Sequence, residues 1–389
     1  MPAGRTLLVL AVLGFLSLGL PDGVLGVAWP SMRRGFELPM SQLGVLLASA
    51  MAGYLASSFA SGTLVARLGV GRLLAASSAA TATSALLYAL APGWGVVLLA
   101  GFVGGLGAGA IDAGINVFAA ARFSPRLTTW LHASWGVGAT LGPVLTSAVL
   151  AAGGSWRGAY GLIGLLLAAL TAAFALTAGR WTTAPAPSAS GPAGPPIVAA
   201  LRRGPVWLNA GLFFLYAGLE VGAGQWAYSW LVEGRGVVPA VAAGWLAVYW
   251  GSLTAGRVVL GALAARVSPE AILRGSLIGV PLGVGWLWAG LGPASGAAGL
   301  AVLGLALAPI FPLLIAATPG RVGAPYAAHA IGFQIAAHCL GTAALPGAAG
   351  LLARRVGLEV FGPFLLGTAA ALGALYGIQL AWHGRRSRG

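Results

Sequence analysis

The stretch TAPAPSASGPAGPPI, residues 183–197, is the only long polar and proline-rich segment of this chain. A mixture of proline, serine, glycine and alanine favours a flexible connection over a packed element. The stretch lies near the middle of the 389 residues and divides the chain into two parts of similar length. We therefore predict a first unit over 1–180, a linker over 181–204 and a second unit over 205–389.

Both parts are strongly apolar. Apolar residues make up 58% of the chain and charged residues only 7%, and the mean hydropathy is +0.90. Soluble domains carry about 25% charged residues, so this composition does not supply a water-facing surface. We predict an all-α integral membrane protein, in contact with a lipid bilayer.

The hydropathy pattern predicts twelve spans, six on each side of the proline-rich segment. One bilayer crossing needs roughly 20 mainly apolar residues, and stretches of this length are separated by short breaks rich in arginine, glycine and proline. The expected spans are 6–28, 42–65, 72–92, 95–120, 129–152, 158–179, 206–231, 240–263, 271–290, 293–316, 326–351 and 359–382.

The formal net charge of +14 does not indicate a nucleic-acid partner. Such a partner requires a basic face or stripe, whereas these arginines stand at the ends of spans. Most of them fall on one side when the N-terminus is placed in the cytoplasm, and cytoplasmic loops are enriched in basic residues. We expect a protein of a prokaryotic cytoplasmic membrane with both termini cytoplasmic.

The two halves share short ordered matches. Gly62-Thr-Leu-Val-Ala-Arg67 matches Gly261-Ala-Leu-Ala-Ala-Arg266 at an offset of 199 residues, and several further pairs align at nearly the same offset. These matches predict a duplication and two pseudo-symmetric six-helix bundles. Parallel repeats of this kind suit a transporter whose halves tilt around a site at the middle of the membrane.

The segment that follows the second span carries a resemblance. Residues 62–72, GTLVARLGVGR, are similar to the cytoplasmic gating motif of the major facilitator superfamily, although Ala66 stands where that family usually has an aspartate. The resemblance implies the major facilitator fold. It also implies gating roles for the arginines of this motif and of its copy in the second half, which are Arg67, Arg72, Arg257 and Arg266.

Three of the seven acidic residues lie inside predicted spans: Asp22, Asp112 and Glu220. An ionised carboxylate at such a position costs at least about 2.5–3.5 kcal/mol. Burial favours the neutral form of a carboxyl group, which suits exchange of protons near neutral pH. We therefore expect these three acids to couple transport to protons. A paired or hydrogen-bonded acid with a structural role is the alternative, above all for Glu220.

Polar and aromatic side chains accompany the acids in several spans. Pairs spaced four residues apart share a helix face, as Asp112 does with Asn116 and Tyr216 with Glu220. Paired donors and acceptors beside aromatic rings are what a sugar or polyol requires. The candidate binding residues are Asp22, Asn116, His132, Tyr216, Glu220, Gln225, Trp226, Trp250, His329, Gln334 and His338. The alternatives are interfacial tryptophans and histidines satisfied in the core.

Span 4 narrows the resemblance. Its sequence GAGAIDAGINVF, residues 107–118, resembles the acid-x-x-x-Asn segment of the fucose, galactose and glucose proton symporters, and Asp22 matches the acid of their first span. This resemblance implies that Asp22 takes part in sugar binding and proton coupling and that Asp112 helps to carry the proton. It also matches His132 to a polar position on the sugar side.

Two hypotheses about function remain open. The first is alternating-access symport of a monosaccharide or related polar solute with protons, and the second is a proton antiporter that exports drugs or apolar metabolites. A membrane enzyme lacks support, since the sequence has no metal-ligand cluster of the HExxH kind and no phosphate-binding GxxxxGK[ST]. We expect no cofactor, no metal and no nucleic-acid partner, and a protein that acts as a monomer.

Overall fold

The computed structural model describes residues 2–182, 197–263, 266–292 and 294–386, and the described residues form helices joined by short turns. Ten of these helices are long and apolar enough to cross a membrane. Large apolar side chains point outward, among them Phe59 at 81% and Leu176 at 86% exposed. An outer surface of this kind suits lipid rather than water, so the predicted all-α membrane fold is confirmed.

The first half contains five long helices. They are α1 (Pro2–Gly35), α2 (Gln42–Leu90), α3 (Trp94–Arg122), α4 (Pro125–Ala151) and α5 (Trp156–Thr177), followed by the short η1 (Ala178–Arg180). The second half begins with the short α6 (Ile197–Leu201). It continues with α7 (Gly204–Ser229), η2 (Trp230–Gly234), α8 (Pro239–Leu263), α9 (Pro269–Ala289), α10 (Ser295–Leu307), α11 (Ile310–Val322), η3 (Ala324–Tyr326), α12 (Ala327–Val356), η4 (Leu358–Val360) and α13 (Phe361–Arg386).

Two elements differ in form from the predicted spans. The spans expected at 42–65 and 72–92 are the two arms of α2, which is broken at Gly69, where φ is 72° and ψ is 162°. A side chain with a Cβ would be strained at that φ. The span expected at 293–316 is divided into α10 and α11 at Pro309, which has no N–H to continue the helix. With α2 counted twice and α10 and α11 together, the part of the chain that the structure describes makes the expected twelve crossings.

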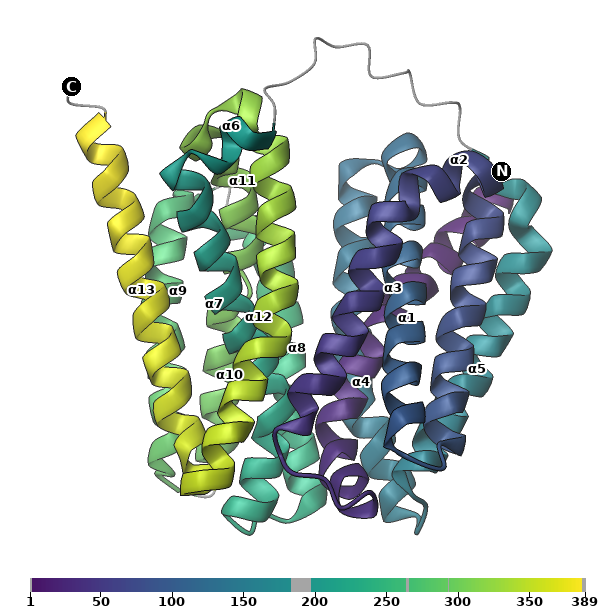
Figure 1. Ribbon diagram of the computed structural model, residues 1–389, viewed down its shortest axis with the longest axis horizontal. Helices are drawn as coiled ribbons and strands as arrows, with labels where there is room; N and C mark the ends of the chain where they lie inside the picture. Colours follow the sequence, from purple (N-terminus) through teal and green to yellow (C-terminus); the bar gives the residue numbers. More distant parts are fainter. Residues whose placement is uncertain (1, 183–196, 264–265, 293, 387–389) are drawn as a thin grey trace.

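The crossings form two bundles that stand side by side (Figure 1). Helices α1–α5 make one bundle and α7–α13 the other, and both ends of the chain lie at the upper end of the view in Figure 1. The predicted pair of six-helix bundles is therefore confirmed. Of the predicted linker, residues 183–196 lie outside the described part of the chain.

The bundles meet through α1 with α7, α2 with α12 and α4 with α8. Toward the end opposite the termini, Arg33 Nη2 lies 2.9 Å from Glu233 Oε2, and Arg34 pairs with the same carboxylate. At that end Gly44 also meets Gly347, where an added Cβ would lie 2.5 Å from the facing Cα. Small residues let helix backbones approach closely in a membrane. The halves are thus in close contact at the end away from the termini.

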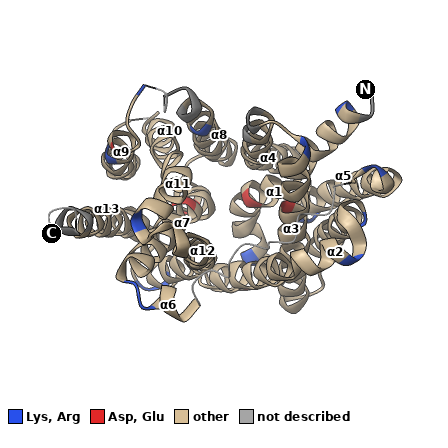
Figure 2. Cartoon of the chain, turned by 90° about the horizontal axis from the view of Figure 1, so that it is seen from above, with Lys and Arg blue, Asp and Glu red and all other residues tan. Residues whose placement is uncertain are grey.

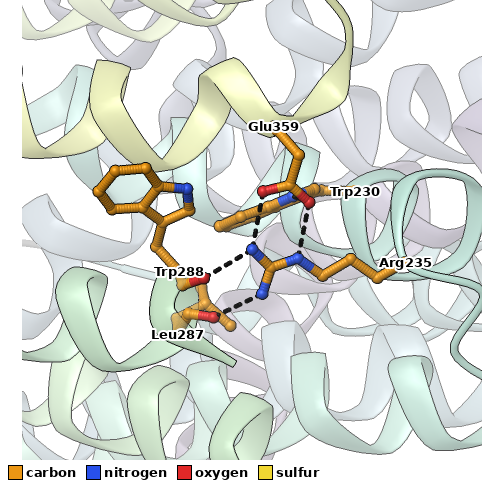
Figure 3. A network of polar contacts seen from close by, with 5 residues as sticks. All are labelled: Trp230, Arg235, Leu287, Trp288 and Glu359. Atoms are coloured by element: carbon orange, nitrogen blue, oxygen red, sulfur yellow. Dashed lines mark hydrogen bonds and ion pairs between the residues drawn. The ribbon is translucent and has the colours of Figure 1, made fainter. Parts of the chain in front are cut away.

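At the same end, Arg235 joins three segments of the second bundle (Figure 3). Its Nε and Nη2 donate to the two carboxylate oxygens of Glu359, each at 2.8 Å. Its guanidinium also donates to the carbonyl oxygens of Leu287 and Trp288, the last turn of α9, and lies over the Trp230 ring. A cation at carbonyls that a helix leaves unpaired stabilises its C-terminus. This network ties the ends of α7, α9 and α13 together within one half.

Candidate functional site

The three acids expected inside spans lie on α1, α3 and α7. Of these helices, α1 and α7 meet across the boundary between the bundles. In the view from above, acidic positions near these helices lie toward the middle of the molecule, where the halves face each other (Figure 2). Most basic positions lie farther out. The candidate site is therefore the region between the bundles around these acids.

Glu220 on α7 is paired with an arginine. Its Oε1 lies 3.2 Å from Arg257 Nη2 on α8, and its side chain is 6% exposed. Tyr216, one turn earlier, hydrogen-bonds the same carboxylate, and the Tyr249 hydroxyl donates to the Glu220 carbonyl oxygen at 2.7 Å. The paired arrangement left open by the sequence is thus what the structure shows for Glu220. Arg257, expected among the gating arginines at span ends, lies inside the bundle instead.

Asp22 on α1 faces this pair from the other half. It lies close enough to Glu220 for the two carboxylates to interact electrostatically, and the Trp135 indole hydrogen-bonds its side chain. Gln225 Nε2 donates to the Asp22 carbonyl oxygen at 3.0 Å. Asp22 is half-buried and contacts groups of both bundles, so it lies on the boundary between them.

The close crossing of α1 and α4 places Trp135 beside Asp22. An added Cβ on Gly19 would clash with the Trp135 carbonyl oxygen, so the two backbones touch. Gly19 and Asp22 are three residues apart and share a helix face. The Trp135 ring then meets the second bundle, with Arg257 Cζ 4.9 Å from its centroid and the Trp250 ring at 5.8 Å. One indole therefore contacts charged groups of both halves.

Asp112 lies in a second polar group within the first half. Tyr54 on α2 donates its hydroxyl to Asp112 Oδ2 at 2.7 Å. Asn116 Nδ2 donates to Asp112 Oδ1 at 2.9 Å, so the residues predicted to share a face are in contact. His132 on α4 interacts electrostatically with both Asp112 and Arg257. It therefore lies between the two polar groups, and its ring meets the Phe15 ring edge-on.

Burial separates the predicted binding residues into two sets. Side chains that retain exposure are Asp22, Asn116, His132, His329 and His338. Those that are buried are Tyr216, Glu220, Gln225, Trp226, Trp250 and Gln334. In this conformation the side chains of the second set are closed off from solvent.

Two members of the buried set are already used in packing. Trp226 donates its indole N–H to the Pro346 carbonyl oxygen and stacks on Phe361 at 4.7 Å. Gln334 Nε2 donates to Thr318 Oγ1 at 2.9 Å. Both side chains are thus satisfied inside the second bundle in this conformation, and their contact with a solute stays a prediction.

The two histidines of α12 have different positions. His338 lies against the Phe311 and Tyr216 rings, at 5.5 and 6.1 Å, and interacts electrostatically with Glu220 and Arg257. Its Nδ1 has no hydrogen-bond partner among the described residues. His329 lies in the first turn of α12, nine residues before His338. Its inclusion in the site stays a prediction.

The remaining gating candidates lie on the surface. Arg67 and Arg72 flank the Gly69 break of α2, and Arg266 lies in the turn before α9; all three are exposed. None of the ion pairs found between described residues includes them. Their gating role stays a prediction.

Sequence reasoning missed Tyr54 and Trp135. Each is an aromatic residue in the middle of a long apolar span, and tryptophan or tyrosine in a membrane helix is ordinarily read as lipid-facing or core. A partial signal existed for Tyr54, because Ser57, Ser58 and Ser61 follow it on the same arm of α2. No such signal surrounds Trp135.

Within the described residues, no group of three or more potential metal ligands lies together.

The chain is similar to known membrane transporters in sequence pattern and in fold. The family model described as Major Facilitator Superfamily matches residues 11–346. Among solved structures, the chain is similar to a point mutant of the nucleoside transporter NupG, with a TM-score of 0.80 and 14% identity. That match covers 95% of this chain and 99% of the other. No curated protein matches the sequence. At this identity the structural likeness shows the fold alone.

Proposed function

The chain belongs to the major facilitator superfamily, and from that premise we propose that it imports a monosaccharide or a related polar solute together with protons. It is a secondary transporter that works by alternating access. Asp22, Glu220 and Asp112 carry the proton coupling. The second hypothesis, antiport of drugs or apolar metabolites, is tested against this one below.

The observation that carries the proposal is the charge balance between the bundles. Two carboxylates, Asp22 and Glu220, face a single guanidinium, that of Arg257. With both acids ionised the cluster has one excess negative charge, which is costly to bury inside a membrane. One bound proton neutralises it. A site that is neutral only when a proton is present favours movement of the bundles in the protonated state.

The solute class follows from the accessible side chains. Asp22, Asn116, His132 and His338 are polar, retain exposure and come from four different helices. Beside His338, the partly buried Phe311 ring offers an aromatic face. Hydroxyl groups need paired donors and acceptors, while the apolar face of a sugar packs on an aromatic ring.

Alternating access requires the contacts between the bundles to exchange ends. We infer that 1–180 and 205–389 move as units. The arginine distribution supports cytoplasmic termini, so the present contacts at the opposite end close the site from outside. Opening that end requires separation of Glu233 from Arg33 and Arg34 and of α2 from α12.

The test is uptake of labelled fucose, galactose and glucose into proteoliposomes, with and without an inward proton gradient. We expect accumulation of at least one hexose with the gradient and its loss when a protonophore collapses the gradient. A thermal-shift screen of the same sugars identifies ligands beforehand, because a ligand that binds the folded state stabilises it. Proton-driven extrusion of an apolar dye without hexose accumulation would establish the antiport hypothesis instead.

A further inference from the structure

The Trp135 side chain contacts Asp22 in its own bundle and the Arg257 guanidinium in the other bundle. Its indole N–H hydrogen-bonds Asp22, and its ring lies under Arg257 with Cζ 4.9 Å from the centroid. Its edge meets Trp250 at an interplanar angle of 84°. The donor edge of the ring and its face thus contact groups of opposite charge.

The backbone around Trp135 is held on two sides. On the α1 side, its carbonyl oxygen lies against Gly19. On the α8 side, an added Cβ on the next residue, Gly136, would clash with the side chain of Thr254. The α4 backbone is therefore fixed against both bundles at this level. The indole has little room to move unless α4 and α8 separate, which is the movement that alternating access requires.

The strength of the indole contact depends on whether Asp22 carries a charge. A hydrogen bond to an ionised carboxylate is roughly twice as strong as one between neutral groups. The attraction between a guanidinium and an aromatic face depends on ring position. A proton on Asp22 therefore weakens the hold on the indole, which in turn loosens the packing of the ring against Arg257.

We propose that Trp135 is a positioning residue that couples proton occupancy of Asp22 to the Arg257–Glu220 pair across the boundary between the bundles. The proposal rests on the proposed proton coupling and names the group that transmits it. Other groups also face the two ends of this link. Glu220 and Tyr160 face Asp22, and Tyr216, Tyr249, His132 and His338 face Arg257.

Two substitutions of Trp135 test its N–H donor and its aromatic ring separately, and a third variant is the control. Trp135→Phe keeps a ring under Arg257 and removes the N–H donor, whereas Trp135→Leu removes both. Trp130→Phe is the matched control, because Trp130 lies on the same helix and is 58% exposed on the outer surface. Thermal stability and size-exclusion profiles identify any variant that fails to fold.

The transport readout is the pH profile of hexose accumulation set against counterflow exchange, which needs no net proton movement. For Trp135→Phe we expect exchange within about twofold of wild type and a loss of about tenfold or more in gradient-driven accumulation, with a flatter pH profile. Trp135→Leu loses both activities, and Trp130→Phe loses neither. A wild-type pH profile in Trp135→Phe would overturn the proposal.

A second readout requires no solute. The tryptophan emission of wild type minus that of Trp135→Phe isolates the Trp135 indole, and we expect this difference to change with pH and to become constant in an Asp22→Asn background. A difference that is flat in wild type overturns the proposal. If the emission changes as expected while wild type accumulates no hexose, the proposed transport function fails and the Asp22–Trp135 link stands.

Discussion

Arg257 and Glu220 form an ion pair inside the second bundle, with 3.2 Å between Nη2 and Oε1 and side chains only 26% and 6% exposed. Removing one member of a buried pair leaves a charge without compensation, while removing both avoids that penalty. For a buried pair, each single substitution should therefore destabilise the protein more than the double substitution does, which is not expected for a surface pair. It also explains how an apolar span accommodates Glu220.

We expect Arg257→Gln and Glu220→Gln each to lower the free energy of unfolding by about 3–5 kcal/mol. The double variant should recover most of that loss, because no buried charge remains. Thermal unfolding in detergent measures the effect. Arg274→Gln is the control, since Arg274 and Glu270 form an exposed pair at 3.9 Å on α9. A double variant as unstable as the two losses summed would contradict this account.

Asp112→Asn should abolish uphill uptake and leave some counterflow exchange. The substitution keeps the shape of the side chain and an acceptor for Tyr54, but removes the group that binds a proton. Accumulation and exchange are measured in the same proteoliposomes. Glu270→Gln, at an exposed acid, should behave as wild type. The proton role of Asp112 is wrong if the variant still accumulates solute with the wild-type pH dependence.

Asp22→Asn should weaken both binding and transport. Asp22 contacts Trp135 and faces Glu220, and it retains exposure to a solute. Loss of a hydrogen bond to a charged group costs about 1.5–3 kcal/mol, so we expect affinity to fall by about tenfold or more. Binding of the hexose found by thermal shift provides the measurement. An unchanged affinity would show that Asp22 does not contact the solute.

Gly44→Ala should disfavour the conformation described here. The new Cβ would lie 2.5 Å from Gly347 Cα in the other bundle, and backbone atoms have no rotamer with which to yield. Overpacking costs typically about 1–3 kcal/mol, which lowers the population of this state by about fivefold or more. We expect reduced exchange with retained folding. Gly285→Ala on α9 is the control, because an added Cβ there meets nothing within 4 Å. Equal exchange in both variants would show that the added Cβ at position 44 does not force the bundles apart.

Glu233→Gln should loosen contact between the bundles at the end opposite the termini. It removes the carboxylate shared by Arg33 and Arg34, and partly exposed pairs are worth about 0.2–1 kcal/mol each. Ser147 on α4 lines a hollow with Arg34 and with Tyr228 of the other bundle. In a Cys339→Ser background, which lacks the one cysteine of the sequence, we expect a maleimide to label Ser147→Cys about two to five times faster when Glu233 is replaced. Glu359→Gln disrupts the Arg235 network within one bundle and should leave the labelling rate unchanged. Equal labelling rates with and without Glu233 would show that its ion pairs with Arg33 and Arg34 do not hold the bundles together at this end.

The sequence alone was sufficient for the membrane class, the twelve crossings and the two related halves. Those properties follow from quantities that are local along the chain: apolar runs of span length, arginines at span ends and matches near an offset of 199 residues. Asp112 and Asn116 were also predicted to meet, because an i, i+4 spacing on one helix places side chains on one face whatever surrounds them.

The tertiary structure decided which of the candidate side chains meet and which are already satisfied. Glu220 on α7 pairs with Arg257 on α8. Asp112 on α3 accepts a hydrogen bond from Tyr54 on α2, and the Trp226 indole donates to the Pro346 carbonyl oxygen. None of these contacts has a fixed spacing in sequence. They depend on how closely helices cross and how each is rotated about its axis, and in a chain this uniformly apolar the hydropathy pattern contains almost no information about that rotation.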